Sequence, residues 1–413
     1  MAPRRLDPAE LASVLPAGGR TLVLACSGES LLLAEAVMRA GRDLGAMIFT
    51  GIFVPGLNSR TYLANPLCRV ETFFLTPELK AAGDAVSFLP LCYGDILARL
   101  RAVQIDAALF MATTPDANGW CSFGPVVDFL AELWPRIPVR IAHLNPLMPR
   151  TLGHRGIPYS ELTAVIEQEQ DLLGFPAATD DPVADAIAMH VLRWVRDGAT
   201  IQTGLGKIPG AVLRSLKARR NLRIHSGLIG DAVAELEQAG ALAEGCAVTG
   251  GVAIGSQRLY DAVGGSAYRF EPASYTHAPG VVANISNFVA INSAVEVDLL
   301  GQAYAEMGLG GLMSGPGGAS DFARGAWCGG GLRIVALPAS AAKGAVSRIV
   351  APNAGTGPVS LGRMDTDIVV TEFGAADLRG LSHHARARAL ITIAPANHRE
   401  TLERAWASFA EKF

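Results

Sequence analysis

The sequence predicts an α/β protein made of two similar α/β domains with mainly parallel sheets. The chain has 413 residues, which is more than one ordinary hydrophobic core accommodates and suggests two domains of typical size. Half of the residues are apolar and 18% are charged, with 45 glycines and 24 prolines, which is typical of a turn-rich globular protein. Short β-branched or aromatic runs alternate with longer helical patterns, as βα units around a parallel sheet require.

The first domain is predicted to span residues 1–188. Six short apolar runs in it are expected to form strands, because β-branched and aromatic residues dominate them. These runs are RTLVLAC from residue 20, AMIFTGIF from 46, RVETFFL from 69, VSFLPL from 86, AALFMA from 107 and PVRIAHL from 138. The polar stretch FPAATDDPVADAIA follows at residues 175–188. It is interpreted as a linker or as the first helix of the second domain, because Asp181 and Pro182 can cap and start a helix.

The second domain is predicted to span residues 189–413. Its expected strands lie in the runs ATIQTG from residue 199, RIHSGL from 223, FVAINSAVEVDLL from 288, RIVALPA from 333 and DIVVTEFG from 367. Residues 383–413 carry apolar positions at helical spacing with charges between them, which predicts terminal helices. No fixed-period repeat of the solenoid type is found, although two α/β halves of similar size can be structurally related.

Composition excludes several classes of function. A net charge of −3 from nearly balanced acids and bases does not suggest nucleic acid or an anionic membrane as a partner. No apolar stretch approaches the ~20 residues of a membrane span, and the N-terminal apolar run is too short for a signal peptide. The six cysteines form no C-x-x-C pair, and none of the eight histidines has H-E-x-x-H spacing. We therefore expect a cytoplasmic protein with reduced thiols and no metal site.

The strongest local signal is the run ATIQTGLGKIPGAVLRSL at residues 199–216. A strand leads into Gly204-Leu205-Gly206 and then into a helix, so backbone N–H groups point outward at a helix N-terminus. Such a turn can hold an anion or a developing oxyanion. The alternative interpretation is a glycine turn needed only for tight packing of strand against helix. The spacing of the glycines does not match the fingerprint of nicotinamide-binding proteins.

Two further segments can carry chemistry. The glycine-rich run SGPGGASDFARGA at residues 314–326 lets backbone approach a ligand closely, and Arg324 can pair with a phosphate or with Asp321. The alternative is a purely structural loop. The run TEFGAADLRGLS at residues 371–382 is interpreted as a solvated helix start. No G-x-S-x-G elbow is present, so the sequence gives no support to a serine hydrolase.

Taken in order, these segments resemble the acetyl-CoA hydrolase/transferase family, which includes 4-hydroxybutyrate, butyrate and acetate CoA-transferases. The resemblance covers most of the chain from about residue 100 onward and implies a CoA-transferase-like fold. The stretches that carry it are TTPDANGWCSFG (113–124), NPLMPRTLG (145–153), IQTGLGKIPGAVLRSL (201–216), GSQRLYDAV (255–263), VAINSAVEVDLLGQ (289–302), SGPGGASDFARGA (314–326) and VVTEFGAADLRGLS (369–382).

The family resemblance also implies a mechanism. A glutamate attacks the acyl-CoA thioester and forms an enzyme-bound anhydride, followed by a glutamyl-CoA thioester, so coenzyme A is a substrate or product and no cofactor is needed. Backbone N–H groups from two glycine turns form the oxyanion hole. A small carboxylate is the second substrate of a transferase, and family members are commonly homo-oligomers. Carried to this chain, the two turns fall at Gly204, Leu205 and Gly206, and at Gly317 and Gly318.

This sequence departs from the family pattern at the reaction centre. The family glutamate lies in a stretch resembling I-H-S-E-M-I-S-D, and here residues 224–231 read IHSGLIGD, which puts Gly227 at the glutamate's position. The paired glycines are followed by Ala319, where the family often has glutamine. Glycine cannot act as a nucleophile and leaves room in which water or a bulkier substrate can sit.

Other carboxylates can replace the missing one. Glu29, in the SGES turn after the first strand, matches a glutamate often found in the family's first turn and is the preferred general base. Glu296 is the other candidate, although Glu296 and Asp298 can equally be ordinary strand-end residues. The remaining residues that we assign to substrate or coenzyme A binding, by position in the two turns, are Gly204, Lys207, Ala319, Asp321, Phe322 and Arg324.

Three functions follow from this pattern. The first is acyl-CoA hydrolysis, in which the cleaved bond is the thioester or a C–C bond of a β-keto acyl-CoA and a base such as Glu29 activates water. In the second, coenzyme A transfer to a carboxylate such as acetate survives with Glu29 or Glu296 as nucleophile. In the third, the chain is a non-catalytic subunit that binds coenzyme A. Because the glycine turns are retained, we expect an enzyme.

Overall fold

The computed structural model describes residues 2–175, 181–308 and 310–412. The chain separates into two compact units, Met1–Pro176 with Val248–Thr276, and Ala177–Ala247 with His277–Phe413. The units are not continuous in sequence, because residues 248–276 rejoin the first unit. The predicted domain limits, 1–188 and 189–413, stay a prediction. None of the helices in the described residues is both long enough and apolar enough to cross a membrane.

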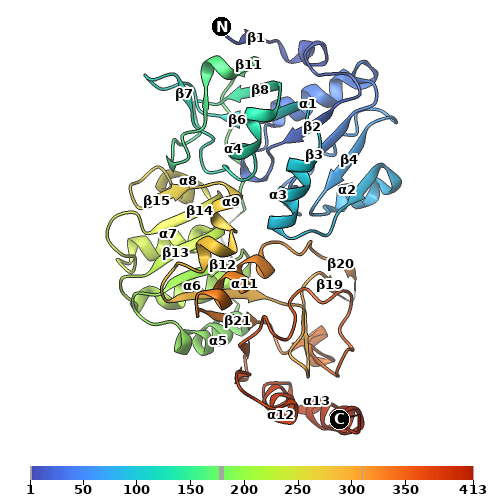
Figure 1. The fold of residues 1–413 in the computed structure, drawn as a ribbon, viewed down its shortest axis with the longest axis vertical. Coiled ribbons are helices and arrows are strands. Elements are labelled where there is room, and N and C mark those ends of the chain that lie inside the picture. Colours follow the sequence, from blue (N-terminus) through green and yellow to red (C-terminus); the bar gives the residue numbers. More distant parts are fainter. Residues whose placement is uncertain (1, 176–180, 309, 413) are drawn as a thin grey trace. The chain divides into compact units, whose positions relative to one another are not determined.

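The first unit contains an eight-stranded sheet in which every adjacent pair is parallel (Figure 1). All six strands predicted for this part of the chain are present. In sheet order the strands are β1 (Arg4–Arg5), β11 (Ala164–Glu167), β8 (Val139–Leu144), β6 (Ala107–Ala112), β2 (Arg20–Val23), β3 (Ile48–Gly51), β4 (Arg69–Thr72) and β5 (Val86–Phe88). The helices of this sheet are α1 (Leu31–Ala40), α2 (Pro77–Ala81), α3 (Tyr93–Ala102) and α4 (Leu130–Leu133).

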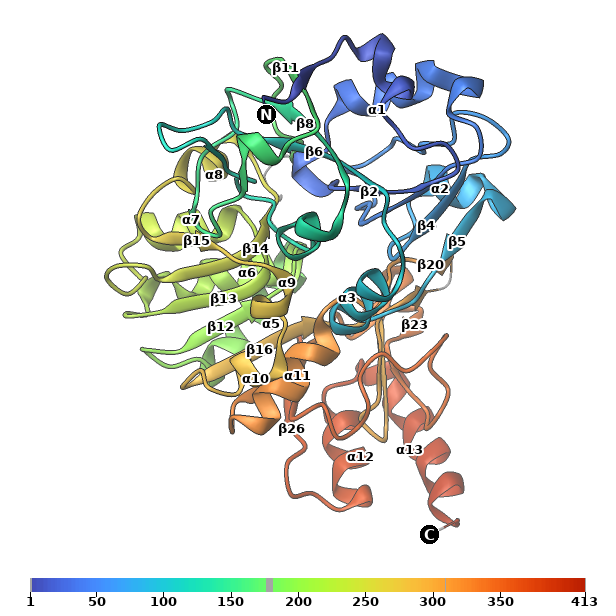
Figure 2. The ribbon, with the colours of Figure 1, turned by 45° about the horizontal axis from the view of Figure 1, so that its top comes forward.

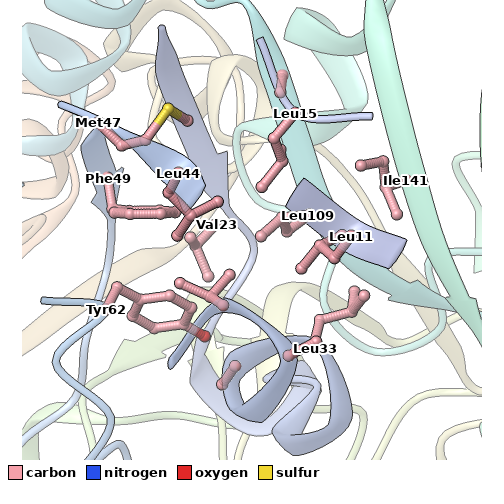
Figure 3. Packing of buried hydrophobic residues seen from close by; sticks show 14 of the residues in the cluster. Leu11, Leu15, Val23, Leu33, Leu44, Met47, Phe49, Tyr62, Leu109 and Ile141 are labelled. Carbon is pink, nitrogen blue, oxygen red and sulfur yellow. The ribbon is translucent and has the colours of Figure 1, made fainter. Parts of the chain in front are cut away.

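The core of the first unit lies between the sheet and α1. Strand β6 is buried along its whole length, as expected for a central strand of a parallel sheet with both faces covered. Figure 3 shows Tyr62 beside Phe49, with ring centroids 5.5 Å apart, and Leu33 of α1 in the same cluster. Because Tyr62 is buried in this cluster, its hydroxyl group needs a polar partner inside the protein.

The first unit also holds a short parallel ribbon that the sequence pattern did not reveal. Its strands are β14 (Val248–Ala253), β15 (Tyr268–Phe270) and β9 (Leu152–Gly153), with helices α8 (Gln257–Ala262) and α9 (Ala273–Thr276). Strands β10 (Ile157–Pro158) and β7 (Trp120–Cys121) form an antiparallel pair. Strand β14 reads VTGGVA, and its two glycines weaken the β-strand signal in the sequence.

The second unit is built on six strands in the order β26-β25-β21-β16-β12-β13, parallel except for the β25–β26 pair. Their bounds are β26 (Gly374–Asp377), β25 (Ile368–Thr371), β21 (Leu332–Ala336), β16 (Phe288–Ser293), β12 (Thr200–Thr203) and β13 (Arg223–Ile229). The helices are α5 (Pro182–Val191), α6 (Lys207–Ser215), α7 (Asp231–Gln238), α10 (Pro279–Val282), α11 (Ala319–Cys328), α12 (His383–Thr392) and α13 (Ala396–Ala410). These sheets confirm the predicted α/β class.

Small elements complete the second unit. The predicted run FVAINSAVEVDLL divides into β16 and β17 (Glu296–Asp298), and β17 belongs to a three-stranded sheet with β18 (Ala303–Tyr304) and β24 (Ile349–Val350). Two antiparallel pairs are β19 (Met307–Gly308) with β20 (Gly311–Leu312), and β22 (Ser340–Ala341) with β23 (Val346–Ser347). Figures 1 and 2 show α12 and α13 side by side, where Trp406 Nε1 donates to His384 Nδ1 over 3.2 Å. The predicted terminal helices are therefore confirmed.

The start of helix α5 follows the predicted capping pattern. Residues 176–180 of the predicted linker lie outside the described residues, whereas Asp181 and Pro182 occupy the N-cap and first helical positions. Asp181 Oδ1 accepts hydrogen bonds from the backbone N–H groups of Val183 and Ala184, at 3.1 and 3.2 Å. Asp181 Oδ2 also lies 3.1 Å from Lys207 Nζ, an ion pair whose lysine side chain is mostly exposed.

We expect Asp181→Ala to lower the free energy of unfolding by about 1 kcal/mol, because two N–H groups of the helix lose their acceptor. The matched control is Lys207→Ala, which removes only the exposed ion pair and should change stability by less than about 0.5 kcal/mol. Urea denaturation of both variants measures the difference. Equal losses in the two variants would mean that the ion pair, not the cap, stabilises this helix.

Candidate active site

The first glycine turn and Gly227 lie side by side at the carboxyl edge of the second unit's sheet. Strands β12 and β13 are parallel, with Thr200 opposite Arg223, and the same register places Gly204 next to Gly227. The hydroxyl group of Ser226 donates to the carbonyl of Thr203 over 2.6 Å, which holds this register at the strand ends. Ligands of open parallel sheets bind at this edge.

The turn Gly204-Leu205-Gly206 leads directly into α6. Gly206 has φ 125°, a conformation that strongly favours glycine, and no side chain caps the helix at this residue. Pro209 in the first turn has no N–H group, so the N–H groups of Lys207 and Ile208 are the ones that face the turn. They can receive a carbonyl oxygen or another anion. The Lys207 side chain itself is paired with Asp181.

The space that a side chain at position 227 would need is occupied by the imidazole of His277. A Cβ atom on Gly227 would overlap Nε2 and Cε1 of His277, far inside the 3.4 Å of ordinary van der Waals contact. His277 lies between α9 and α10, 50 positions further along the chain. Nothing in the sequence around His277 indicates this role, because the histidine reaches the site through tertiary packing alone.

The second glycine turn meets the same imidazole. A Cβ atom on Gly318 would lie 2.7 Å from Nε2 of His277, so both glycines are required for the ring to fit. The ring packs on Phe322 of α11, with centroids 4.8 Å apart. Gly317 has φ 62°, which favours glycine, and Gly318 is the N-cap of α11 without a side-chain cap. Ala319 is the first residue of that helix.

The electrostatic environment keeps His277 neutral. The side chain is buried, and burial lowers its pKa to about 3, with the nearby His225 imidazole as a second cause. His225 lies on β13 two residues before Gly227 and is also buried. A neutral imidazole has one N–H donor and one lone-pair acceptor, so His277 can both accept and donate a proton.

The three other site residues predicted on α11 differ in their surroundings. Asp321 and Phe322 are buried near the start of the helix, where an acidic side chain is favoured by the helix dipole. Arg324 is exposed and lines a cavity with Trp327 near the end of the helix. The structure therefore brings Phe322 to the His277 cluster and directs Arg324 away from it.

Glu29 lies in the first unit, in the turn after β2, and has no exposed surface. Its Oε1 accepts a hydrogen bond from the Tyr62 hydroxyl group and its Oε2 accepts one from Asn58 Nδ2, both at 2.9 Å. Burial raises the pKa of Glu29, while these two hydrogen bonds oppose the shift. The carboxylate is thus the polar partner that the buried Tyr62 requires.

Glu296 and Asp298 have structural roles in the three-stranded sheet of the second unit. Glu296 Oε2 accepts from the backbone N–H of Thr356 over 2.6 Å. Asp298 accepts from the backbone N–H groups of Leu300, Gln302 and Asn353, each at 3.0 Å, and anchors the connection between the strands. Among the described residues, no group of three histidine, cysteine, aspartate or glutamate side chains is arranged to hold a metal ion.

Solved structures define the class of this fold. The structure of RipA from Yersinia pestis matches with a TM-score of 0.92 and 28% identity, covering 98% of both chains. The 4-hydroxybutyrate CoA-transferase of Porphyromonas gingivalis matches with a TM-score of 0.81 and 28% identity, covering 99% of this chain and 98% of that one. The chain thus has a CoA-transferase-like fold, as the sequence predicted.

Sequence comparison identifies the family. Residues 255–406 match the model of the acetyl-CoA hydrolase/transferase C-terminal domain. The 4-hydroxybutyrate coenzyme A transferase of Clostridium kluyveri is 39% identical over 312 residues, covering 73% of this chain and 72% of that protein. The succinyl-CoA:cyclohexane-1-carboxylate CoA transferase of Geobacter metallireducens is 30% identical over 411 residues, covering 97% and 94%. The chain belongs to the acetyl-CoA hydrolase/transferase family and is an acyl-CoA hydrolase or a CoA-transferase.

We expect Gly227→Ala to lower the free energy of unfolding by roughly 1–3 kcal/mol, because the added methyl group overlaps a buried ring. Gly204→Ala is the matched control. A Cβ atom on Gly204 meets no heavy atom within 4 Å, so this change should alter stability by less than about 0.5 kcal/mol. Thermal or urea denaturation tests the pair. An unaffected Gly227→Ala protein would show that the imidazole moves aside at little cost.

Stability should also depend on pH through His277. The folded protein protonates this imidazole only near pH 3, whereas the unfolded chain does so near its ordinary pKa of 6.5. Between these values the unfolded state binds one more proton, so stability falls by about 1.4 kcal/mol per pH unit as pH drops below 6.5. Urea denaturation at several pH values should therefore give a shallower acid dependence for His277→Asn than for wild type. Parallel curves would rule out a neutral, buried His277.

Proposed function

We propose that this enzyme hydrolyses acyl-CoA thioesters, with water in place of an enzyme carboxylate as the nucleophile. The observation that carries the proposal is the imidazole of His277 in the space beside Gly227. The family resemblance implies that transfer proceeds through a glutamate at that position. Gly227 supplies no carboxylate, and the neighbouring ring leaves no room for one, so the acyl-enzyme anhydride cannot form there.

The two glycine turns retain a function in hydrolysis. Attack of water on the thioester carbonyl places negative charge on its oxygen, and N–H groups at the start of a helix stabilise such a charge. The turn before α6 and the turn before α11 both start a helix without a capping side chain. Gly204, Leu205, Gly206, Gly317 and Gly318 are accordingly the proposed oxyanion-binding residues.

His277 is the proposed general base. Its imidazole takes a proton as the water oxygen bonds to the carbonyl carbon, and returns a proton to the sulfur as the C–S bond breaks. The products are a carboxylic acid and the thiol of coenzyme A. A low pKa makes the free imidazole a weak base, but a developing oxyanion beside the ring stabilises its protonated form.

Glu29 is the alternative base. It matches a family position, but both of its oxygens accept hydrogen bonds, one from Tyr62 and one from Asn58. Its proposed role is therefore to hold Tyr62 and Asn58 in place. Glu296 is similarly engaged by Thr356, which disfavours transfer through that carboxylate.

A relative supports cleavage of the thioester over cleavage of a C–C bond. The acetyl-CoA hydrolase of Kluyveromyces lactis is 30% identical over 247 residues, covering 56% of this chain and 46% of that protein. The same oxyanion turns can hold the enolate formed when a β-keto acyl-CoA is cleaved, so such substrates belong in the assay panel. Lys207 and Arg324 were assigned to substrate or coenzyme A binding. The Lys207 side chain forms an ion pair with Asp181, and Arg324 lines a separate cavity.

The decisive assay follows release of free thiol from a panel of acyl-CoA substrates, with and without acetate. We expect release that is independent of acetate and leaves no covalent adduct detectable by mass spectrometry. His277→Asn should lower kcat by about 10²–10⁴-fold. Glu29→Gln is the comparison. It should mainly lower stability, by about 1–3 kcal/mol, because one of the two donors, Asn58 or Tyr62, then faces an NH2 group instead of an acceptor.

Three results would contradict this proposal. Acetate-dependent formation of acetyl-CoA with a trapped glutamyl adduct would restore the transferase. A large loss of kcat in a stable Glu29→Gln protein would make Glu29 the base. No turnover of any substrate, with coenzyme A bound, would support a non-catalytic subunit.

As a positive test, the Gly227→Glu/His277→Ala double variant should acquire acetate-dependent transfer, whereas Gly227→Glu alone should be destabilised by the ring.

A further inference from the structure

A cavity of about 640 Å³ lies within the second unit, at the edge of the sheet opposite to the glycine turns. It is bordered by Trp327 at the end of α11, by Arg333 at the start of β21, and by residues 363–367 immediately before β25. These are the amino ends of parallel strands, whereas Gly204 and Gly227 lie at the carboxyl ends. Helix α11 thus begins at the candidate active site and ends at this cavity.

The lining of the cavity has an excess of positive charge. Five arginines line it: Arg324, Arg333, Arg363, Arg379 and Arg386. Arg333 is neutralised by a bidentate pair with Asp367, and Arg379 is paired with Asp377 over 2.7 Å. Among the described residues that line the cavity, Asp365 is the carboxylate left to offset the other three arginines. The lining therefore keeps a net positive charge.

Arg386 is the most buried of the three lining arginines for which no salt bridge is found among the described residues. Its guanidinium group is half-buried and donates to the backbone carbonyls of Leu300, Arg363 and Leu378, at 3.2–3.4 Å. Within the described residues it forms no ion pair with a carboxylate. Burial lowers its pKa and the charge of the neighbouring Arg363 lowers it further, while the charge of Asp367 opposes the shift. An anion in the cavity would relieve the repulsion between these two arginines.

Two explanations that need no ligand do not account for this arrangement. The negative end of the α11 dipole favours a nearby cation such as Arg324, but neither Arg363 nor Arg386 lies on that helix. Arginine side chains can also be merely solvated, but the half-buried Arg386 is held by hydrogen bonds to three backbone carbonyls, one of them that of Arg363. Planar guanidinium groups that converge on one cavity suit phosphate oxygens.

An exposed tryptophan borders the same cavity. The side chain of Trp327 is 66% exposed, whereas large aromatic residues are usually buried to a greater extent. An aromatic face next to arginines can stack on the planar base of a nucleotide while the arginines bind its phosphates. A ligand with phosphate groups but no ring would leave this face in water.

We propose that this cavity is a second binding site, separate from the candidate active site, for a nucleotide whose base stacks on Trp327 and whose phosphates contact Arg324, Arg363 and Arg386. The same chemistry occurs in two sources, a free nucleotide such as ADP and the nucleotide part of a coenzyme A molecule. The site goes beyond the proposed function, because binding here does not depend on which reaction the enzyme catalyses.

Isothermal titration calorimetry of the full chain tests the proposal with ADP, adenosine, inorganic phosphate and coenzyme A as separate probes. We expect ADP to bind more tightly than adenosine or phosphate alone. Arg363→Gln and Trp327→Ala should each weaken ADP binding by about tenfold. Both side chains are exposed, so these variants should fold, which circular dichroism verifies. The matched control is Arg404→Gln, because Arg404 is an exposed arginine on α13 that pairs with Glu400, and this variant should bind ADP as wild type does.

The titrations also separate the two sources. Coenzyme A binding to two sites per chain, one of which is lost in Arg363→Gln, would support coenzyme A as the source. ADP binding that coenzyme A does not displace would support a free nucleotide. No ADP binding, or binding unchanged in both variants, would overturn the proposal. Phosphate that binds as tightly as ADP would also overturn it, because the ring would then contribute nothing.

Discussion

The candidate active site depends on one steric constraint: the imidazole of His277 and a side chain at position 227 cannot occupy the same space. A protein interior is close-packed, so a group of this size either fills the site or is excluded from it. Here the ring fills it and lies against both Gly227 and Gly318, which brings the second glycine turn beside the position of the family glutamate. The register of β12 and β13, held by the Ser226 hydroxyl group, fixes where this packing occurs.

Burial determines the chemistry that this packing allows. In the second unit it keeps His277 neutral, which gives the ring a lone pair at physiological pH. In the first unit it raises the pKa of Glu29, and hydrogen bonds from Tyr62 and Asn58 oppose that shift. Both groups are removed from water, and burial acts on them in the same sense, because it disfavours the charged form of each.

Much of the fold could be predicted from the sequence because apolar runs and turn residues are local signals. The strand around Leu109 is a continuous apolar run, the strand around Ile201 carries three β-branched residues, and Asp181 and Pro182 marked the start of α5. Strand β14 escaped prediction because its two glycines mimic a turn. Its inclusion in the first unit also depends on contacts that no local pattern encodes.

The candidate site was predictable only in part, because a sequence pattern reveals local features and not contacts between distant segments. The glycine turns have local signatures, and the family resemblance pointed to Gly227. His277 could not be predicted as a site residue, because it is distant in sequence from Gly227 and has no motif of its own. Arg324 was assigned to coenzyme A from its proximity in sequence to Gly318, whereas helix α11 carries it toward the other edge of the sheet.

The return of residues 248–276 to the first unit has a consequence for how the chain can be divided. The second unit is assembled from two segments, and Gly227 lies on the first of them while His277 is the first residue of the other. During synthesis, the ribosome must therefore complete residues 248–276 before the His277 ring can pack against Gly227. Neither unit of this chain can be exchanged by a single crossover in the gene, so a chimaera that replaces one unit must replace two separate segments together.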